Sequence, residues 1–298
     1  MNKILGKLKA LFQHNEQHEM YINSGIDLLA EDFSGSTDGS GGASSSDAGT
    51  GAALAPLVIP ESVRRFEITT AEGNRLRVTK RPSVSIAAGS KGRYCFILYS
   101  DDFVEQAKYQ ERIYRKAGCK VESYLTDTKV HFKAAWERMA EVSRKADVYR
   151  VVMIPHSNGR AFMLTAGSSL EAYSVNGLNK AHEDIGDFRQ LEDANIEELI
   201  IYSCNSGHLD LARVPYGNVA TTFLQKPGIR KVISYDGGIS YGYPYLPYLT
   251  KITGNYYPRV PIPSSEQAIF HDILGKLHLK ERKPYGLLGY EKAKKTRV

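Results

Sequence analysis

The 298-residue chain is 42% hydrophobic and 24% charged, a composition typical of a globular protein that buries a substantial core. No apolar run reaches the roughly 18 residues that a membrane-spanning helix needs, so the sequence predicts none. The net charge of +6 comes from residues 276–298, which hold eight Lys or Arg and two acidic residues. The other residues are neutral overall, so their charge gives no reason to expect nucleic acid as a partner of the core domain.

The three cysteines, Cys95, Cys119 and Cys204, are odd in number, widely spaced and free of any CxxC pattern. This usage indicates neither a disulfide framework nor a thiolate metal site, and it is typical of a reducing compartment. We expect a cytoplasmic protein, or one delivered into a cytosol, because the N-terminus lacks the continuous apolar segment of a secretory signal. We expect neither a metal nor a cofactor.

Two segments precede the predicted core domain. Residues 1–33 form an N-terminal segment in which residues 1–12 place apolar side chains on one helical face and lysines mostly on the other. This pattern predicts a short amphipathic helix that docks on the protein or makes weak contact with a membrane or partner. Residues 34–56 form a flexible linker rich in Gly and Ser, where self-cleavage or removal of the N-terminal piece is an open alternative.

The core domain is predicted over residues 57–262. Residues 64–86 alternate polar and apolar side chains around Gly73-Asn74, which indicates a β-hairpin at the edge of a sheet. Strands are then predicted at 94–99, 120–125, 149–154, 198–203 and 231–235, and helices at 103–117, 132–146 and 218–225. This alternation predicts a three-layer α/β/α sandwich with a mostly parallel central sheet. Residues 161–194 are predicted to hold a hairpin and an acidic loop at 183–187, and residues 263–298 are expected to form a basic C-terminal helix or tail.

A histidine and a cysteine follow two of the predicted strands. His156 comes directly after the apolar run 149–154 and its Pro155, and Cys204 comes after the run 198–203. The carboxyl ends of parallel strands meet at one edge of an open α/β sheet, where ligands bind. If the two strands are neighbours, the imidazole and the thiol face the same crevice.

The layout resembles that of caspase-like cysteine peptidases, which also place a His at the end of one strand and a Cys at the end of the next, about 50 residues later. The resemblance covers roughly residues 90–245, and Ser-Cys-Asn-Ser-Gly is similar to caspase-like domains of bacterial toxins and effectors. It implies a cysteine endopeptidase that acts on a protein or peptide substrate. Two departures are Ser157, where the family usually has Gly, and Tyr202-Ser203 before the cysteine, so specificity for aspartate is not carried over.

The predicted chemistry uses Cys204 as nucleophile and His156 as general acid and base. Backbone N–H groups of Cys204, Ser157 and Gly159 are the candidates for an oxyanion hole. No metal is needed for this reaction. His208 offers a competing Cys/His pair or, with His156, a metal site, although Gly207 disfavours the continuous helix that such a pair requires.

Candidates for substrate binding lie near the same strand ends. Asp236 follows the strand 231–235, where a carboxylate could receive Arg or Lys at the cleavage position. Its alternative interpretation is an Asp-Gly turn residue. Asp101 and Asp102, after the strand 94–99, are further candidates, and so is Ser203 beside the thiol.

Two other classes of function remain open. A non-catalytic relative would keep the fold and use the crevice for binding, and burial of Cys204 or its separation from His156 would favour it. A module that binds nucleic acid or a membrane through the basic tail would lose its function when residues 276–298 are removed, whereas peptide cleavage by a peptidase should survive this deletion.

Overall fold

The fold was analysed in a computed structural model, which describes residues 57–157, 159–166, 169–174, 191–214, 217–242, 260–263 and 282–293. All of them fall within one unit of the chain, Ala55–Phe270 with Leu279–Val298. The predictions for residues 1–33, the linker 34–56 and the acidic loop 183–187 all lie outside the described residues.

Eight of the described strands form a central mixed sheet in the order β1-β2-β13-β10-β9-β5-β3-β4. Their bounds are β1 Arg65–Thr69, β2 Arg75–Lys80, β3 Tyr94–Tyr99, β4 Lys120–Leu125, β5 Val148–Ile154, β9 Ile196–Ile201, β10 Ile229–Asp236 and β13 Gly286–Lys292. The run from β10 to β4 is parallel throughout, whereas β1, β2 and β13 pair antiparallel on the other side. The sheet is therefore mostly parallel, as the sequence predicts.

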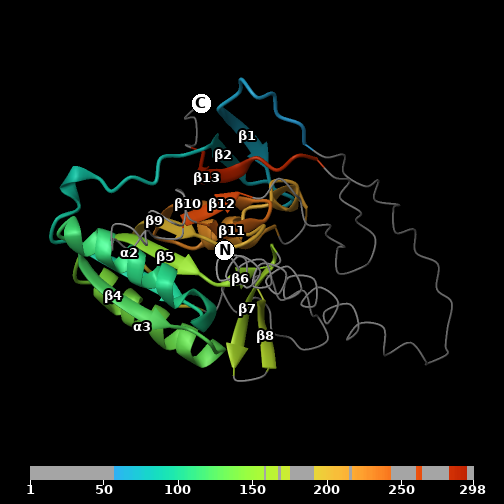
Figure 1. The fold of residues 1–298 in the computed structure, drawn as a ribbon. Coiled ribbons are helices and arrows are strands. Elements are labelled where there is room, and N and C mark those ends of the chain that lie inside the picture. The colour runs from blue at the N-terminus through green and yellow to red at the C-terminus, as the bar shows by residue number, and fades with distance from the viewer. Residues whose placement is uncertain are drawn as a thin grey trace, which may run out of the picture. The chain divides into compact units, whose positions relative to one another are not determined.

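Helices cover both faces of this sheet. The described α-helices are α2 Val104–Lys116, α3 Lys129–Ser143 and α5 Val219–Gln225. Helices α3 and α5 lie on one face, where the rings of Trp136 and Phe223 stand 5.3 Å apart. Helix α2 lies on the opposite face, because its Tyr114 bonds Arg150, which points away from the core residue Val151. The arrangement is visible in Figure 1 and defines an α/β sandwich.

Most predicted elements are found within two or three residues of their expected bounds. The hairpin predicted over 64–86 is confirmed as β1 and β2, with Gly73 in the left-handed region at φ 80°. Helix α5 begins after Asn218, whose side chain accepts a hydrogen bond from the N–H of Thr221 in a capping box. Strand β9 ends at Ile201 rather than at residue 203, so Cys204 stands three residues beyond it.

The C-terminal region departs from its prediction. Residues 286–292, expected in a basic helix or tail, form β13, which pairs with β2 on one side and β10 on the other. Leu288 and Tyr290 are fully buried on one face of this strand, and their burial outweighs the surrounding lysines. The core domain therefore extends beyond residue 262, and deletion of 276–298 would remove an interior strand.

Two small sheets lie beside the central one. The first consists of β6 His156–Ser157, β7 Ala161–Ala166 and β8 Ser169–Ser174, which includes the predicted hairpin. The second consists of β11 Ile239–Gly242 and β12 Val260–Pro263. The described residues contain no helix with the length and hydrophobicity needed to cross a membrane.

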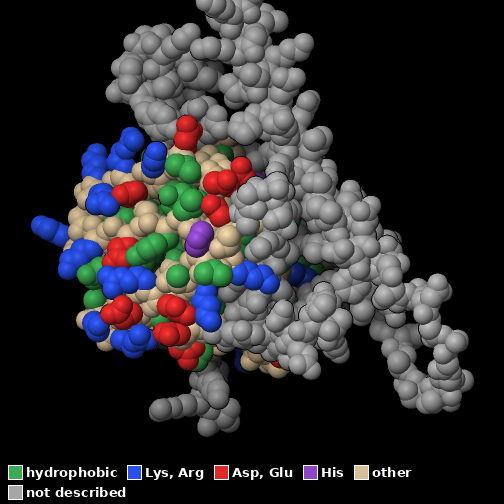
Figure 2. Space-filling model, turned by 90° about the horizontal axis from the view of Figure 1, so that it is seen from below, with side chains coloured by type: hydrophobic (Ala, Val, Ile, Leu, Met, Phe, Trp, Pro, Cys, Tyr) green, Lys and Arg blue, Asp and Glu red, His purple; other side chains and the backbone are tan. Residues whose placement is uncertain are grey.

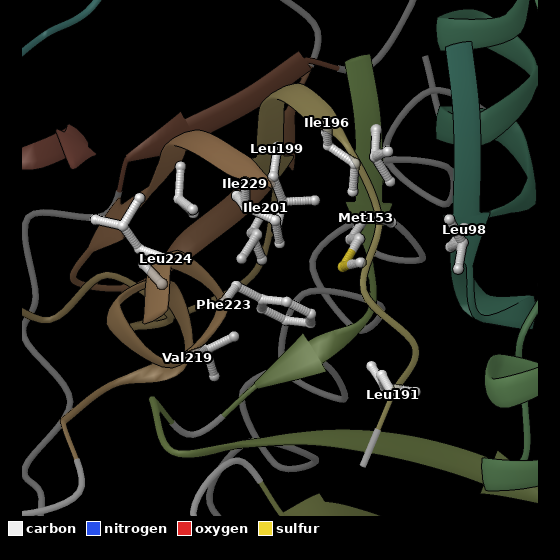
Figure 3. Close-up of a cluster of buried hydrophobic side chains, with 14 of the residues drawn as sticks. Leu98, Met153, Leu191, Ile196, Leu199, Ile201, Val219, Phe223, Leu224 and Ile229 are labelled. Atoms are coloured by element: carbon white, nitrogen blue, oxygen red, sulfur yellow. The ribbon is translucent and has the colours of Figure 1, made fainter. Parts of the chain in front are cut away.

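The hydrophobic core holds the ends of β5 and β9 in place. Figure 3 shows Phe223 of α5 directed towards these two strands, which carry Met153 and Ile201. All three side chains are fully buried. Because His156 and Cys204 come two and three residues after these strands, the core fixes where the chain leaves the sheet towards both residues.

Candidate active site

His156 and Cys204 leave neighbouring parallel strands at the same level. Met153 of β5 is the register partner of Ile201 of β9, and the N–H of Tyr202 donates to the Met153 carbonyl at 2.8 Å. His156 lies three positions after Met153, and Cys204 lies three positions after Ile201. The sheet therefore brings the imidazole and the thiol to one edge, as expected from parallel strands.

The imidazole of His156 is buried and oriented by a carboxylate. Its Nε2 lies 3.1 Å from Oδ2 of Asp102, which follows β3 and is half exposed. The ring also packs against Phe103, with centroids 4.7 Å apart. Because a carboxylate accepts hydrogen bonds, Nε2 carries the proton in the neutral ring, and Nδ1 is the nitrogen that can act as a base.

The thiol of Cys204 is enclosed by a neighbouring backbone. Only 4% of the residue is exposed, and its Sγ lies 3.6 Å from the carbonyl oxygen and 3.4 Å from the nitrogen of Ile239 in β11. Burial raises the pKa of the thiol, and the N–H groups of Ile239 and of Cys204 itself only partly offset it. Both hydrogen bonds of this sulfur within the described chain go to Ile239, and none reaches His156.

The loop after the thiol is held in a special backbone conformation. Asn205 adopts φ 56°, which is uncommon for a residue with a side chain, and its N–H donates to Gly237 at 2.8 Å. Gly207 runs so close to β10 that a Cβ would lie 2.9 Å from the Cβ of Ser234. The turn chemistry after Cys204 therefore fixes the loop that carries Cys204 against β10.

Asp236 lies at the end of β10, as predicted, but its carboxylate is engaged inside the protein. It accepts two hydrogen bonds from Arg282, at 2.7 and 2.8 Å, and one each from the N–H of Leu209 and of Tyr285. Burial alone would raise its pKa, but the hydrogen bonds and charge of Arg282 and the N–H of Tyr285 lower the pKa instead. We therefore assign Asp236 to an internal ion pair and not to a substrate.

The other predicted residues occupy different positions around the dyad. Ser203 is buried, and its Oγ has no hydrogen-bond partner within the described chain. The N–H of Gly159 donates to Oγ of Ser157 at 3.0 Å, so this oxyanion candidate is already bonded. Asp101 is exposed beside Asp102 and accepts its N–H at 2.9 Å.

His208 does not form the alternative pair with Cys204. It is fully buried, its Nδ1 accepts the N–H of Leu211 at 3.4 Å, and its electrostatic neighbours are Asp236, Arg282 and Asp210. Burial lowers its pKa and keeps the ring neutral. Among the described residues, no group of three His, Cys, Asp or Glu side chains is placed to hold a metal ion.

The sequence did not single out the side chains that join the two halves of the site. The ring of Phe103 contacts both His156 and, at 5.2 Å, the ring of Tyr241. The hydroxyl of Tyr241 in turn donates to the carbonyl of Tyr202, two residues before the thiol. The sequence does contain a pattern that points to Tyr241, because residues 237–245 are rich in Gly and Tyr, a composition typical of adaptable binding loops.

Charged side chains of both signs lie on one face of the described domain. Figure 2 shows Lys and Arg side chains interspersed with Asp and Glu on the face seen there, with hydrophobic side chains between them.

Comparison with known proteins finds no family model that matches the chain and no curated protein with significant similarity to it. Function is therefore inferred from the residues and their geometry.

Proposed function

We propose that this chain is a caspase-like cysteine endopeptidase that cleaves peptide bonds with Cys204 and His156. One observation carries the proposal: His156 and Cys204 each lie three residues beyond Met153 and Ile201, which pair with each other on neighbouring parallel strands. A buried imidazole bonded to Asp102 supports it, because a general base needs a fixed tautomer and orientation. The caspase-like family itself is part of the proposal.

The proposed reaction has two steps. The Cys204 thiol gives its proton to His156, and the sulfur attacks the peptide carbonyl carbon. The C–N bond then breaks as His156 returns the proton to the leaving amine, which leaves an acyl group on the sulfur. Water, deprotonated by His156, hydrolyses this thioester and restores the thiol.

Asp102 acts in this scheme as a positioning residue. Its carboxylate holds the Nε2–H of His156 and stabilises the imidazolium that forms when the ring takes the thiol proton. The N–H of Cys204 remains an oxyanion candidate, and one such donor typically lowers the barrier by roughly 3 to 4 kcal/mol. A preference for Arg or Lys has no support from Asp236, whose carboxylate binds Arg282.

A specific observation favours a second function, a non-catalytic binding domain with the same fold. The Cys204 sulfur is buried, its pKa is raised, and it bonds Ile239 instead of His156. In such a protein, Cys204 would act as a small buried apolar residue.

Peptide cleavage separates these two functions. The purified full-length chain is incubated with a pool of fluorogenic peptides that differ at the cleaved position, beside Cys204→Ala and His156→Ala variants. Cys119→Ala is the matched control, because Cys119 is also a buried free cysteine but bonds Ser90, away from the dyad. Cleavage lost in the first two variants and kept in the control supports the peptidase, whereas cleavage that survives Cys204→Ala contradicts it.

A further inference from the structure

The thiol of Cys204 is directed at a strand that lies outside the central sheet. The carbonyl of Ile239 accepts from the sulfur and the N–H of Ile239 donates to it, so one residue occupies both bonding directions. A thiol has a single proton. While this proton points at Ile239, it is not shared with His156, and the first proton transfer of the proposed reaction cannot begin.

The same strand is also linked to His156 through the ring of Phe103. Tyr241, two residues after Ile239, packs its ring on Phe103, whose ring contacts the imidazole. Its hydroxyl donates to the Tyr202 carbonyl at 2.9 Å, next to the thiol loop. Strand β11 therefore contacts Cys204 directly and is linked to His156 through Phe103.

Strand β11 has few other attachments among the described residues. It pairs with β12 in a two-stranded sheet, and Ile239 and Tyr241 stand opposite Pro263 and Pro261. Ile239 directs both its N–H and its carbonyl at the Cys204 sulfur, so its pair with Pro263 contributes no hydrogen bond to this ladder. The connection to β10 is Gly237-Gly238, with Gly237 at φ 102°, a conformation that glycine adopts without strain.

We propose that β11 is a lid and that this structure is the latent form of the site. In the active form, β11 turns about Gly237-Gly238, Ile239 releases the sulfur, and the thiol proton becomes available to His156. The space that Ile239 and Tyr241 leave is where the substrate peptide lies. This inference rests on the proposed role of Cys204 as nucleophile, and it accounts for the burial of the thiol without discarding that role.

Alkylation of cysteines tests the lid without requiring catalysis. The full-length protein is treated with iodoacetamide under native conditions, and the modified fraction of each cysteine is followed by peptide mass mapping. Cys95 and Cys119, both buried, serve as internal controls. We expect slow alkylation of Cys204 in the wild type and an increase of at least tenfold in Tyr241→Ala, with Cys95 and Cys119 still protected.

A milder variant and a matched control guard against a general loss of structure. Tyr241→Phe keeps the ring and removes only the hydrogen bond to Tyr202, so Cys204 alkylation should rise about fivefold. Tyr94→Ala removes another half-buried tyrosine, one that stacks on Phe96 at 6.3 Å, and should leave Cys204 protected. Fast alkylation of wild-type Cys204, no change in either Tyr241 variant, or equal exposure of all three cysteines would each refute the lid.

Peptide cleavage by the same variants keeps the two proposals apart. Cleavage that increases in Tyr241→Ala in parallel with alkylation supports both the lid and the peptidase. Alkylation that increases without cleavage in any variant supports the lid and overturns the peptidase. Cleavage by a wild type whose Cys204 is already reactive supports the peptidase and overturns the lid.

Discussion

Replacement of Asp236 by Asn should destabilise the fold without a specific effect on substrate choice. The carboxylate accepts four hydrogen bonds, two of them from a guanidinium that is itself buried. An asparagine supplies one oxygen and places an NH2 group against the remaining donors. The charge of Arg282 then loses one carboxylate partner and keeps Asp210, at 2.8 Å from its Nε.

The magnitude follows from the cost of breaking a buried ion pair, about 3 to 5 kcal/mol. We expect the lower end, about 3 kcal/mol, because Asp210 still compensates part of the Arg282 charge. At a urea m-value of about 2 to 3 kcal/mol per molar, the unfolding midpoint should fall by about 1 to 1.5 M.

Equilibrium urea unfolding, followed by far-UV circular dichroism, measures this shift. Glu61→Gln is the control, since Glu61 and its partner Arg81 are both exposed and their ion pair spans 2.7 Å. Such a surface pair should contribute less than about 1 kcal/mol. An Asp236→Asn protein with wild-type stability but altered preference for basic residues would refute the internal role and restore the substrate role.

Three further predictions concern the sheet, the dyad and pH. A chain that ends before Gly286 loses β13 and should not fold, as judged by circular dichroism, whereas deletion of residues 294–298 removes three basic residues and spares the strand. Asp102→Ala should lower kcat for peptide cleavage about 10- to 100-fold with little change in KM, because loss of the positioning contact forfeits part of the roughly 100- to 10,000-fold that a positioned base contributes. Burial lowers the pKa of His208 in the folded protein, so the unfolded chain binds a proton more readily. The free energy of unfolding should therefore fall as pH drops below about 6.5, by up to about 1.4 kcal/mol per pH unit. His208→Gln should flatten this slope.

The controls for these predictions keep the local setting and remove the effect. Glu105 is an exposed carboxylate in the first turn of α2, and Glu105→Ala should leave kcat unchanged. His131 is exposed on α3, and His131→Gln should leave the pH slope of stability unchanged. A His208 variant with the wild-type slope would show that the low-pH loss of stability arises elsewhere.

The sequence predicts those parts of the fold that depend on local pattern. The buried run of β5 and the helical spacing of Phe132 and Trp136 define their elements without reference to the rest of the chain. Strand β13 was missed because the basic residues on either side of it, such as Arg282 and Lys283, dominate the composition of the tail. The alternation of Leu288 and Tyr290 was the signal that would have identified it.

The site depends on contacts that no local pattern encodes. Asp102 and His156 are 54 residues apart, and Asp236 and Arg282 are 46 apart. Asp102 and Asp236 were both recognised as carboxylates at strand ends, but a strand end does not reveal which cation the carboxylate meets. Only the folded chain separates the residue that orients His156 from the one that binds Arg282.

The burial of Cys204 has a different physical basis from that of Cys95. Cys95 lies inside β3, between β4 and β5, so its exposure requires the central sheet to open. Cys204 lies beyond the end of β9 and is bonded to Ile239 in a separate two-stranded sheet. Local opening costs less free energy than global unfolding, so two equally buried thiols can differ greatly in reactivity. A buried sulfur at this position therefore does not by itself argue against catalysis.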